Sequence, residues 1–515
     1  MEELQFQCSP EQAKDDEFIS TKIKSLLKLN TDAEVYYTWH KRSIDARKKN
    51  IKINCVFKVS TVDPIKEENQ ICFKPLNTSK TVHIIGMGPA GMFAALHAIK
   101  SGIKPIIYER GKNVRDRRRD LAKLNKEGLV NPESNYCFGE GGAGTYSDGK
   151  LYTRSKKRGD VREVLKLLVQ FGAEKDILID AHPHIGTNKL PHIISAINEK
   201  IISCGGEIHF NCRLTDIHIQ NEKIKEITIN EELKVNVSNI ILATGHSARD
   251  IYELLHKKGV KLLAKPFALG VRIEHTQDFI DQAQYGRLND EFLPPASYKL
   301  ATQIDDKGVY SFCMCPGGII APCATAQDEV VTNGWSPSKR NNPYSNAGIV
   351  VSVTPQDVSD SESPFTCLDF QKEIEHRAWT LAGKNQKVPA QCLLDFIQDE
   401  KSKHFPRSSY QPGIESVKMD DLFPEFICNR LRKGFIEFNK KIPGFISNDA
   451  VIHAPESRTS SPILIPRDKE QLHHLELKNL YPCAEGAGYA GGIVSAAIDG
   501  MNCMLKLAHK EGKTN

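Results

Sequence analysis

The chain has 515 residues, 40% hydrophobic and 26% charged, which fits a soluble globular protein of more than one domain. The net charge of +5 is too small to argue for nucleic-acid binding. The sequence contains no apolar run of the ~20 residues that span a bilayer and no secretory signal, so we expect no membrane association and a cytoplasmic location. The 14 cysteines form no C-x-x-C pair or zinc-spaced Cys/His cluster, which favours a reducing compartment and no metal site.

The first residues, 1–76, predict a small α+β unit. Helical spacing of apolar residues covers 18–29, and an alternating strand pattern covers 51–59. Between them, we interpret the basic segment 39–52 as a helix or loop. The polar stretch 75–80 is typical of a linker.

Residues 81–109 carry the strongest signal, a strand, a glycine turn, a helix and a second strand. In the G-x-G-x-x-G turn, Gly86 permits a tight bend, Gly88 lets backbone approach a pyrophosphate, and Gly91 lets the helix pack closely. The helix N-terminus, with Pro89 and Ala90, offers free N–H groups to phosphates. Glu109 ends the second strand, where its carboxylate can accept hydrogen bonds from the adenosine ribose.

The same glycine pattern recurs at 139–144 and 486–491. The first repeat does not lead into a helix, and the second leaves no room for another strand with a ribose-binding acid. Only Gly86–Gly91 therefore has the full βαβ context. The basic run that starts at Arg110 and continues to Arg119 contacts phosphates in one interpretation and forms a solvated face in the other.

Five ordered segments resemble a family: 138–151, 240–250, 265–275, 456–463 and 481–500. They are similar to the uncharacterised FAD-dependent dehydrogenases of bacteria, often labelled NAD(FAD)-utilising dehydrogenases. The resemblance runs from about residue 80 to 510, and SIDARKK (43–49) extends it. It implies FAD as the cofactor and an α/β fold. Because no His or Cys lies in an attachment context, we expect the FAD to be non-covalent. The expected fold is an FAD-binding Rossmann-like domain of the two-dinucleotide type (77–254 and 446–515), an inserted α+β substrate or cap domain (255–445), and the N-terminal α+β unit.

The resemblance also implies further flavin contacts. The strand at 240–245 would return beside the first βαβ unit, and the last helix would aim its N-terminus at the flavin ring, where negative charge develops on reduction. A loop of small residues would lie against the ring and the pyrophosphate, held by Asp148 and Lys150. The expected contacts are Arg110, Gly141, Gly142, Ala143, Gly144, Thr145, Ser147, Thr244, Gly245, Glu485, Gly486, Gly491, Gly492 and Ile493.

Candidate catalytic residues are few, because a flavin carries its own chemistry. His246 is a candidate acid or base, with a loop-capping role as the alternative. Arg458 is a candidate for binding an anionic substrate or reduced flavin, as is Arg272; for both, the alternative is an ion pair between domains. Cys313 and Cys315, two apart on a predicted strand, should point to opposite faces, so we expect no redox pair.

The sequence thus predicts an FAD-dependent oxidoreductase that transfers hydride between the flavin and a small organic substrate, with NAD(P)H as a transient donor. One alternative is a flavoprotein that binds RNA through the basic N-terminal unit. Its candidate residues are Lys41, Arg42, Arg47, Lys48, Lys49 and Lys52. The other alternative is a non-catalytic FAD-bound sensor or interaction protein. The oligomeric state stays open.

Overall fold

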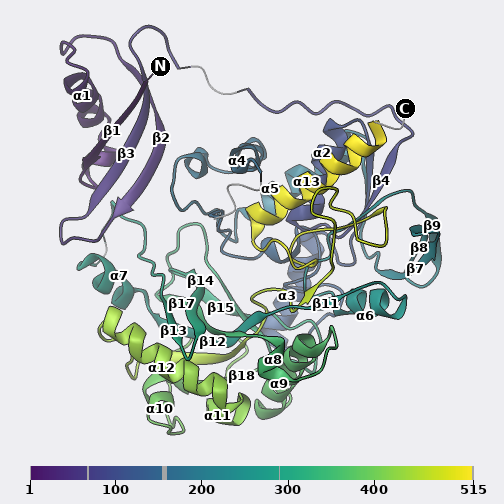
Figure 1. Cartoon of the computed structure of the whole chain (residues 1–515). Coiled ribbons are helices and arrows are strands. Elements are labelled where there is room, and N and C mark those ends of the chain that lie inside the picture. The colour runs from purple at the N-terminus through teal and green to yellow at the C-terminus, as the bar shows by residue number, and fades with distance from the viewer. Residues whose placement is uncertain (1, 66–68, 154–158, 289, 513–515) are drawn as a thin grey trace.

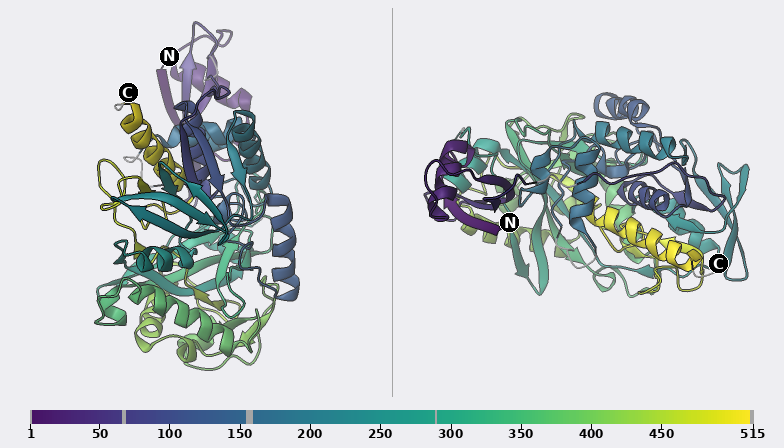
Figure 2. Two further views of the ribbon diagram at one scale, coloured as in Figure 1. Left: turned by 90° about the vertical axis from the view of Figure 1, so that its right-hand side faces the viewer. Right: turned by 90° about the horizontal axis from the view of Figure 1, so that it is seen from above.

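The computed structural model describes residues 2–65, 69–153, 159–288 and 290–512. Figure 1 shows the N-terminal unit (purple), the nucleotide unit with the C-terminal helix α13 (yellow), and an inserted unit (teal to green). Figure 2 shows the N-terminal unit at one end of the molecule. None of the helices in these ranges is long and apolar enough to cross a membrane.

The N-terminal unit is a three-stranded antiparallel sheet with one helix. Strand β1 (Glu2–Cys8) and helix α1 (Asp16–Leu26) precede β2 (Tyr36–Asp45) and β3 (Lys52–Ser60), and the order is β1-β3-β2. The basic helix or loop expected over 39–52 is therefore wrong for most of its length. Trp39 of β2 packs on Phe57 of β3 with ring centroids 4.2 Å apart, and this pairing makes the segment a strand.

The nucleotide unit has a five-stranded parallel sheet in the order β22-β10-β4-β5-β6. The chain visits β4 (Thr81–Ile85), β5 (Lys104–Tyr108), β6 (Glu207–His209), β10 (Ile240–Leu242) and β22 (Leu480–Pro482) in turn. As expected, β10 returns beside β4. Helices α2 (Pro89–Lys100) and α13 (Ile493–Gly512) lie side by side (Figure 1).

Several elements connect these strands. Helices α3 (Val114–Glu127), α4 (Val161–Gln170) and α5 (Leu190–Ser203) lie between β5 and β6 in the chain. A three-stranded meander follows β6, consisting of β7 (Leu214–Gln220), β8 (Lys223–Ile229) and β9 (Leu233–Asn236). Helix α6 (Arg249–Lys257) comes after β10.

The inserted unit, residues 263–464, is closed by the antiparallel pair β11 (Leu263–Ala264) and β21 (Ile463–Leu464). Its seven-stranded sheet has the order β13-β14-β17-β12-β20-β18-β19. The strands are β12 (Phe267–Thr276), β13 (Ala301–Ile304), β14 (Lys307–Cys315), β17 (Tyr344–Val353), β18 (Val388–Cys392), β19 (Ile414–Ser416) and β20 (Val451–Glu456). Because β20 pairs with β12, this sheet extends past residue 445, the limit expected from the sequence.

Helices cover the inserted sheet (Figure 1). Helix α12 (Glu425–Lys441) packs on β13 and β17, and α9 (Thr366–Leu381) packs on β18 and β20. The smaller elements are α7 (Gln277–Tyr285), α8 (Pro355–Val358), α10 (Leu393–Ile397), α11 (Met419–Leu422) and the hairpin of β15 (Ile319–Pro322) and β16 (Thr332–Trp335). The unit therefore has its own hydrophobic core.

Candidate functional site

A cavity of about 280 Å³ opens at the carboxyl ends of the parallel strands. Gly86 follows β4, Glu109 follows β5, Ala243 follows β10 and Ala484 lies just after β22, and all four line it. In open α/β sheets, ligands bind in the crevice outside these strand ends. The fold thus brings the sequence-predicted nucleotide residues to one place.

The three glycines of the turn have separate roles. Gly86 has a φ of +98°, and a Cβ there would lie 2.5 Å from the carbonyl oxygen of Ala243. A Cβ on Gly91 would lie 2.0 Å from the carbonyl oxygen of Gly86, so Gly91 serves helix packing and does not line the cavity. A Cβ on Gly88 would meet only Cα of Gly142, at 3.9 Å. Gly88 therefore faces open space, where its missing side chain leaves room for a pyrophosphate.

The Glu109 carboxylate is fixed by backbone. Oε2 accepts from the Met87 N–H at 2.8 Å, and Oε1 accepts from the N–H groups of Gly111 and Gly139 at 2.8 and 2.9 Å. These bonds hold the glycine turn and the 139–144 loop against the end of β5. Because Oε2 has one donor here, it retains a lone pair for a ribose hydroxyl.

Arg110 lines the cavity, but its charge is balanced within the protein. Its guanidinium lies over the Phe138 ring at 4.2 Å, and it donates to Glu133 at 2.9 Å and Asp250 at 3.0 Å. Arg110 thus links the segment that contains Glu133 and Phe138 to helix α6, and it presents no unpaired charge to a phosphate. Sequence analysis missed Tyr108 and Phe138, and also Cys212, Arg213 and Leu214, which line the same cavity.

Arg117 organises the loop after Gly139. Its fully buried guanidinium donates to the carbonyls of Asn135, Tyr136 and Glu140 at 2.8–2.9 Å and to Thr145 Oγ1 at 3.2 Å. Thr145 in turn donates to the Glu140 carbonyl at 2.7 Å. The basic run is therefore not a fully solvated face.

This arrangement corrects two expected cofactor contacts. Thr145 points at Arg117, and a Cβ on Gly141 would lie 2.2 Å from Thr145 Oγ1, so neither residue lines the cavity. The remaining expected loop contacts do line it, namely Gly142, Ala143, Gly144 and Ser147. A run of charged residues is usually solvated, so the sequence alone does not predict that one arginine of the run is buried.

Helix α13 brings its N-terminus to the cavity. Gly492 has a φ of +81°, its carbonyl accepts from the Ala496 N–H at 3.0 Å, and Gly492, Ile493 and Ala496 line the cavity. The first N–H groups of the helix lack intrahelical partners, so they favour an electron-rich group at this end. Thr244, Gly245 and Glu485, three of the expected cofactor contacts, line the cavity.

Two more glycines expected at the cofactor pack on protein instead. A Cβ on Gly486 would lie 2.8 Å from the backbone nitrogen of Gly245, and one on Gly491 would lie 3.0 Å from Glu485 Oε1. Neither glycine lines the cavity; Gly486 allows a close approach to the Gly245 backbone, and Gly491 leaves room for the Glu485 carboxylate.

His246 lies in the cavity wall. Its Nδ1 is 3.7 Å from Glu485 Oε2, and its buried Nε2 has no hydrogen-bond partner within the described part of the chain. A buried polar atom without a protein partner is uncommon, so Nε2 is available to hydrogen-bond a group bound in the cavity. Of the two proposed catalytic residues, His246 is the one that the fold places at the cavity.

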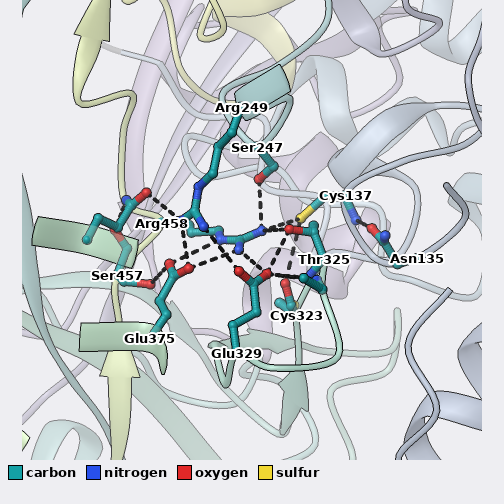
Figure 3. A network of polar contacts seen from close by, with 12 residues as sticks. Asn135, Cys137, Ser247, Arg249, Cys323, Thr325, Glu329, Glu375, Ser457 and Arg458 are labelled. Carbon is teal, nitrogen blue, oxygen red and sulfur yellow. Dashed lines mark hydrogen bonds and ion pairs between the residues drawn. The ribbon is translucent and has the colours of Figure 1, made fainter. Parts of the chain in front are cut away.

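Arg458 does not reach the cavity. Figure 3 shows its guanidinium between Glu329 and Glu375 of the inserted unit, with Arg249 from helix α6 against the same carboxylates. It also donates to Ser247 Oγ at 3.3 Å, across to the nucleotide unit. This corrects the expected substrate contact, because Arg458 forms ion pairs within the inserted unit, and Arg249 pairs with the same two carboxylates from the nucleotide unit.

Arg272 is likewise structural. It is fully buried and donates to both carboxylate oxygens of Glu456, at 2.8 and 2.7 Å, and to Asn346 Oδ1 at 2.7 Å. The alternative of an ion pair is the correct interpretation for this residue too, although its partner lies within the inserted sheet.

One potential metal-ligating group is present among the described residues. Cys483, Asp499 and Cys503 place one ligand atom each within 4.8 Å of one another. However, Arg467 donates to both oxygens of Asp499, at 2.9 and 2.7 Å, and the Ala484 N–H adds a third bond at 2.7 Å. A guanidinium already occupies the place of a cation, so this cluster joins α13 to β22.

The sheet, the turn and the acid after β5 define an α/β protein of the dinucleotide-binding class. Residues 266–459 match the family model described as FAD-dependent protein, C-terminal domain-like, and residues 1–60 match a domain of unknown function. An uncharacterized protein of Clostridium beijerinckii is 38% identical over 493 residues, which cover 91% of this chain and 92% of that protein. The chain belongs to the family of this clostridial protein.

Solved structures show weaker similarity. Tetracycline destructase Tet(51) is 10% identical with a TM-score of 0.36, covering 84% of this chain and 83% of its own. Halogenase PltM is 13% identical with a TM-score of 0.37, covering 85% and 70%. A geranylgeranyl bacteriochlorophyll reductase-like protein of Thermoplasma acidophilum is 14% identical with a TM-score of 0.35, covering 84% and 80%. At these TM-scores the resemblance assigns no reaction to this chain.

Proposed function

We propose that this protein is an FAD-dependent oxidoreductase that transfers hydride between its flavin and a small organic molecule. The observation that carries the proposal is the meeting of two helix N-termini, those of α2 and α13, at one cavity that also contains Glu109. One N-terminus suits a pyrophosphate, and the second suits a ring that becomes negative on reduction. The family model for residues 266–459 names the same cofactor class.

The residues of this chain fit FAD at each part of the cavity. Oε2 of Glu109 would accept from the adenosine ribose, and the open face of Gly88 would admit the pyrophosphate. Bound FAD supplies the two-electron chemistry. The start of α13 would stabilise negative charge, and His246 Nε2 would hold or deliver a proton at the substrate.

We propose NADH or NADPH as a transient electron donor. Glu109 disfavours a 2′-phosphate at the first nucleotide position, since its carboxylate would repel it. The RNA-binding alternative gains no support from its arginines. Arg42 pairs with Asp180 at 2.8 Å, and Arg47 pairs with Asp45 at 2.6 Å.

The test is the visible spectrum of the purified full-length chain, followed by anaerobic addition of NADH or NADPH. Bands near ~370 and ~450 nm would show flavin, and bleaching with one nucleotide would identify the donor. Persistent bands would favour a substrate-reduced dehydrogenase or the non-catalytic alternative. A colourless protein that takes up no added FAD would contradict the proposal.

A further inference from the structure

One of the described residues of the inserted unit lines the cavity. Of its described residues, only Cys313 is among those that line it. Cys313 lies near the end of β14 with a φ of +46°, in the left-handed region that residues other than glycine rarely adopt. The fold therefore holds a thiol at the cavity in an unfavourable backbone conformation, which is typical of functional sites.

A β-bulge brings the side chains of Cys313 and Cys315 to the same side of β14, beside Lys150. Phe312 of β14 pairs with Gly348 of β17, and Cys315 of β14 pairs with Asn346 of β17. Between these two pairs β14 therefore contains one residue more than β17. Such an extra residue locally breaks the alternation of side chains between the two faces. Cys315 Sγ lies 3.3 Å from the Cys313 carbonyl oxygen, and both sulfurs lie within 4 Å of Lys150 Nζ. The expectation that these side chains point to opposite faces is therefore wrong.

Lys150 joins the pair to the cavity loop. Its Nζ lies 3.7 Å from Cys313 Sγ and 3.5 Å from Cys315 Sγ, and Lys150 itself lines the cavity. The ammonium group is thus close to both sulfurs, where it can stabilise a thiolate on either.

The charges around the pair favour a thiolate. Asp148 Oδ2 lies 3.2 Å from Lys150 Nζ and 2.9 Å from Arg340 Nη2, so two cations share one carboxylate. A negative sulfur would complete the balance. The neighbouring Cys315 thiol, together with Lys150 and Arg272, holds the pKa of Cys313 well below its usual value. The same thiol contact and burial raise the pKa of Cys315 well above its usual value.

We propose that Cys313 and Cys315 are a redox-active dithiol that exchanges two electrons with the flavin, an inference that rests on the FAD site proposed above. In one direction, a hydride equivalent from reduced FAD breaks the Cys313–Cys315 disulfide. The hydride carries one proton and one electron pair. Cys315 then becomes a thiol, Cys313 becomes a thiolate beside Lys150, and the flavin is oxidised. In the reverse direction, the S–S bond forms while the electron pair and the proton pass to the flavin. No other oxidant or reductant is needed.

Thiol mapping of the full-length protein tests the pair independently of FAD. Oxidised protein is alkylated, reduced and alkylated again with a reagent of different mass, and the tryptic peptide Gly308–Lys339 is sequenced by mass spectrometry. We expect the second label on Cys313 and Cys315, and the first label on Cys323 of the same peptide. Cys8 and Cys55 serve as controls for indiscriminate oxidation, because their sulfurs are 3.4 Å apart in the N-terminal unit, with no place in the cavity wall.

Anaerobic reductive titration tests the coupling to FAD. We expect about four electrons per FAD in the wild-type protein and about two in Cys313→Ser and Cys315→Ser, since a flavin alone accepts two. Cys315→Ser should also gain a broad absorbance at longer wavelength than the flavin bands, from the unpaired Cys313 thiolate next to the ring, and Lys150→Met added to this variant should weaken it.

The outcomes separate the two proposals. First-label alkylation of both cysteines in oxidised wild-type protein, or two electrons per FAD, would overturn the dithiol while leaving the FAD site intact. A protein that binds no FAD would contradict the proposed function, and the electron exchange with it, whatever the thiol map shows. Because both decisive measurements use wild-type protein, they stand even if a serine variant fails to fold.

Discussion

Gly500 of α13 lies directly against Ala90 of α2. A Cβ at position 500 would lie 2.1 Å from the Ala90 carbonyl oxygen. This distance is shorter than any ordinary non-bonded contact of a Cβ atom in a folded protein. The missing side chain lets the two helices pack backbone to backbone, as their adjacent ribbons show in Figure 1. Both helices begin at the cavity, so this contact sets the distance between the two N-termini that the proposed function uses.

Gly500→Ala should therefore weaken both folding and FAD binding. Overpacking of a tight contact costs ~1–3 kcal/mol, and we expect a loss of this size in the free energy of unfolding. Urea titration measures it, and flavin fluorescence gives the FAD affinity. The matched control is Gly512→Ala at the far end of the same helix, where a Cβ would lie more than 4 Å from every atom of the described chain outside its own helix turn. That change should be neutral or stabilising by up to ~1 kcal/mol. Equal stability of the two variants would refute the helix contact.

Gly88→Ala separates cofactor binding from folding. The new methyl group has room in the protein, because only Cα of Gly142 lies near it, at 3.9 Å, but it enters the cavity. We expect FAD to bind ~10–100-fold more weakly, as overpacking of ~1–3 kcal/mol implies, and thermal unfolding without FAD to change little. Gly91→Ala is the contrast, because its methyl would meet the Gly86 carbonyl oxygen and destabilise the fold itself. Unchanged FAD affinity in Gly88→Ala would place the pyrophosphate elsewhere.

The features that sequence predicts well here are local ones. The turn from Gly86 to Gly91 and the acid at Glu109 follow from a strand, a helix and a strand that are contiguous in the chain, so their geometry is encoded together. Helices α9 and α12 were not predicted in the inserted unit. The buried residues Ile427, Leu431 and Phe438 of α12 follow a helical spacing that could have identified it.

Long-range partners account for the remaining differences. In the sequence, Arg458 is a candidate for substrate binding. The fold places Glu329 and Glu375, which are distant in sequence, against its guanidinium, so that its charge is already paired. Cys313 looks like an ordinary strand residue, because the bulge depends on the register between β14 and β17. Neither the partner of a charge nor the register of a strand is visible in a single segment.

Arg458→Met should destabilise the protein strongly without removing a cavity residue. It leaves Glu329 and Glu375 buried with only Arg249 as cationic partner, and breaking a buried ion pair costs ~3–5 kcal/mol. Urea unfolding measures the change, and any folded fraction should still show the flavin spectrum. Arg377→Met is the control, because its pair with Glu373 is exposed and should be worth at most ~1 kcal/mol. A stable Arg458→Met variant with altered substrate kinetics would restore the catalytic interpretation.

Stability should fall as the pH drops from about 6.5 to about 4. Burial lowers the pKa of His275 and of His453 to about 4, so both stay neutral in the folded protein while the unfolded chain binds protons. The two neutral histidines contribute fully to the free energy of unfolding above their pKa in the unfolded chain. This contribution is lost as the pH falls toward their pKa in the folded protein. Each histidine should add a slope of ~1.4 kcal/mol per pH unit within this window.

His275→Gln tests this slope, since its amide can still donate to the Phe445 carbonyl that the imidazole contacts at 2.9 Å. The free energy of unfolding is measured by urea titration between pH 6.5 and 4. Its slope against pH should be smaller in the variant than in the wild type by the amount that corresponds to about one proton. Carboxylates titrate in the same range, but they contribute equally to both proteins and cancel in the difference. Parallel curves would show that His275 does not change its proton affinity on folding.

His246→Asn tests the remaining catalytic candidate. Nε2 of His246 is buried at the cavity with no partner in the described structure, and Nδ1 lies 3.7 Å from Glu485. If this imidazole transfers a proton, its loss should slow flavin turnover by the ~10²–10⁴-fold typical of general acid–base catalysis. FAD affinity and the visible spectrum should stay near wild type, because the backbone around Gly245 is unchanged. A loop-capping histidine would give the opposite pattern, with weaker FAD binding and lower stability but a normal rate per bound flavin. The pH profile of flavin reduction separates the two, because only the catalytic role removes an ionisation from it.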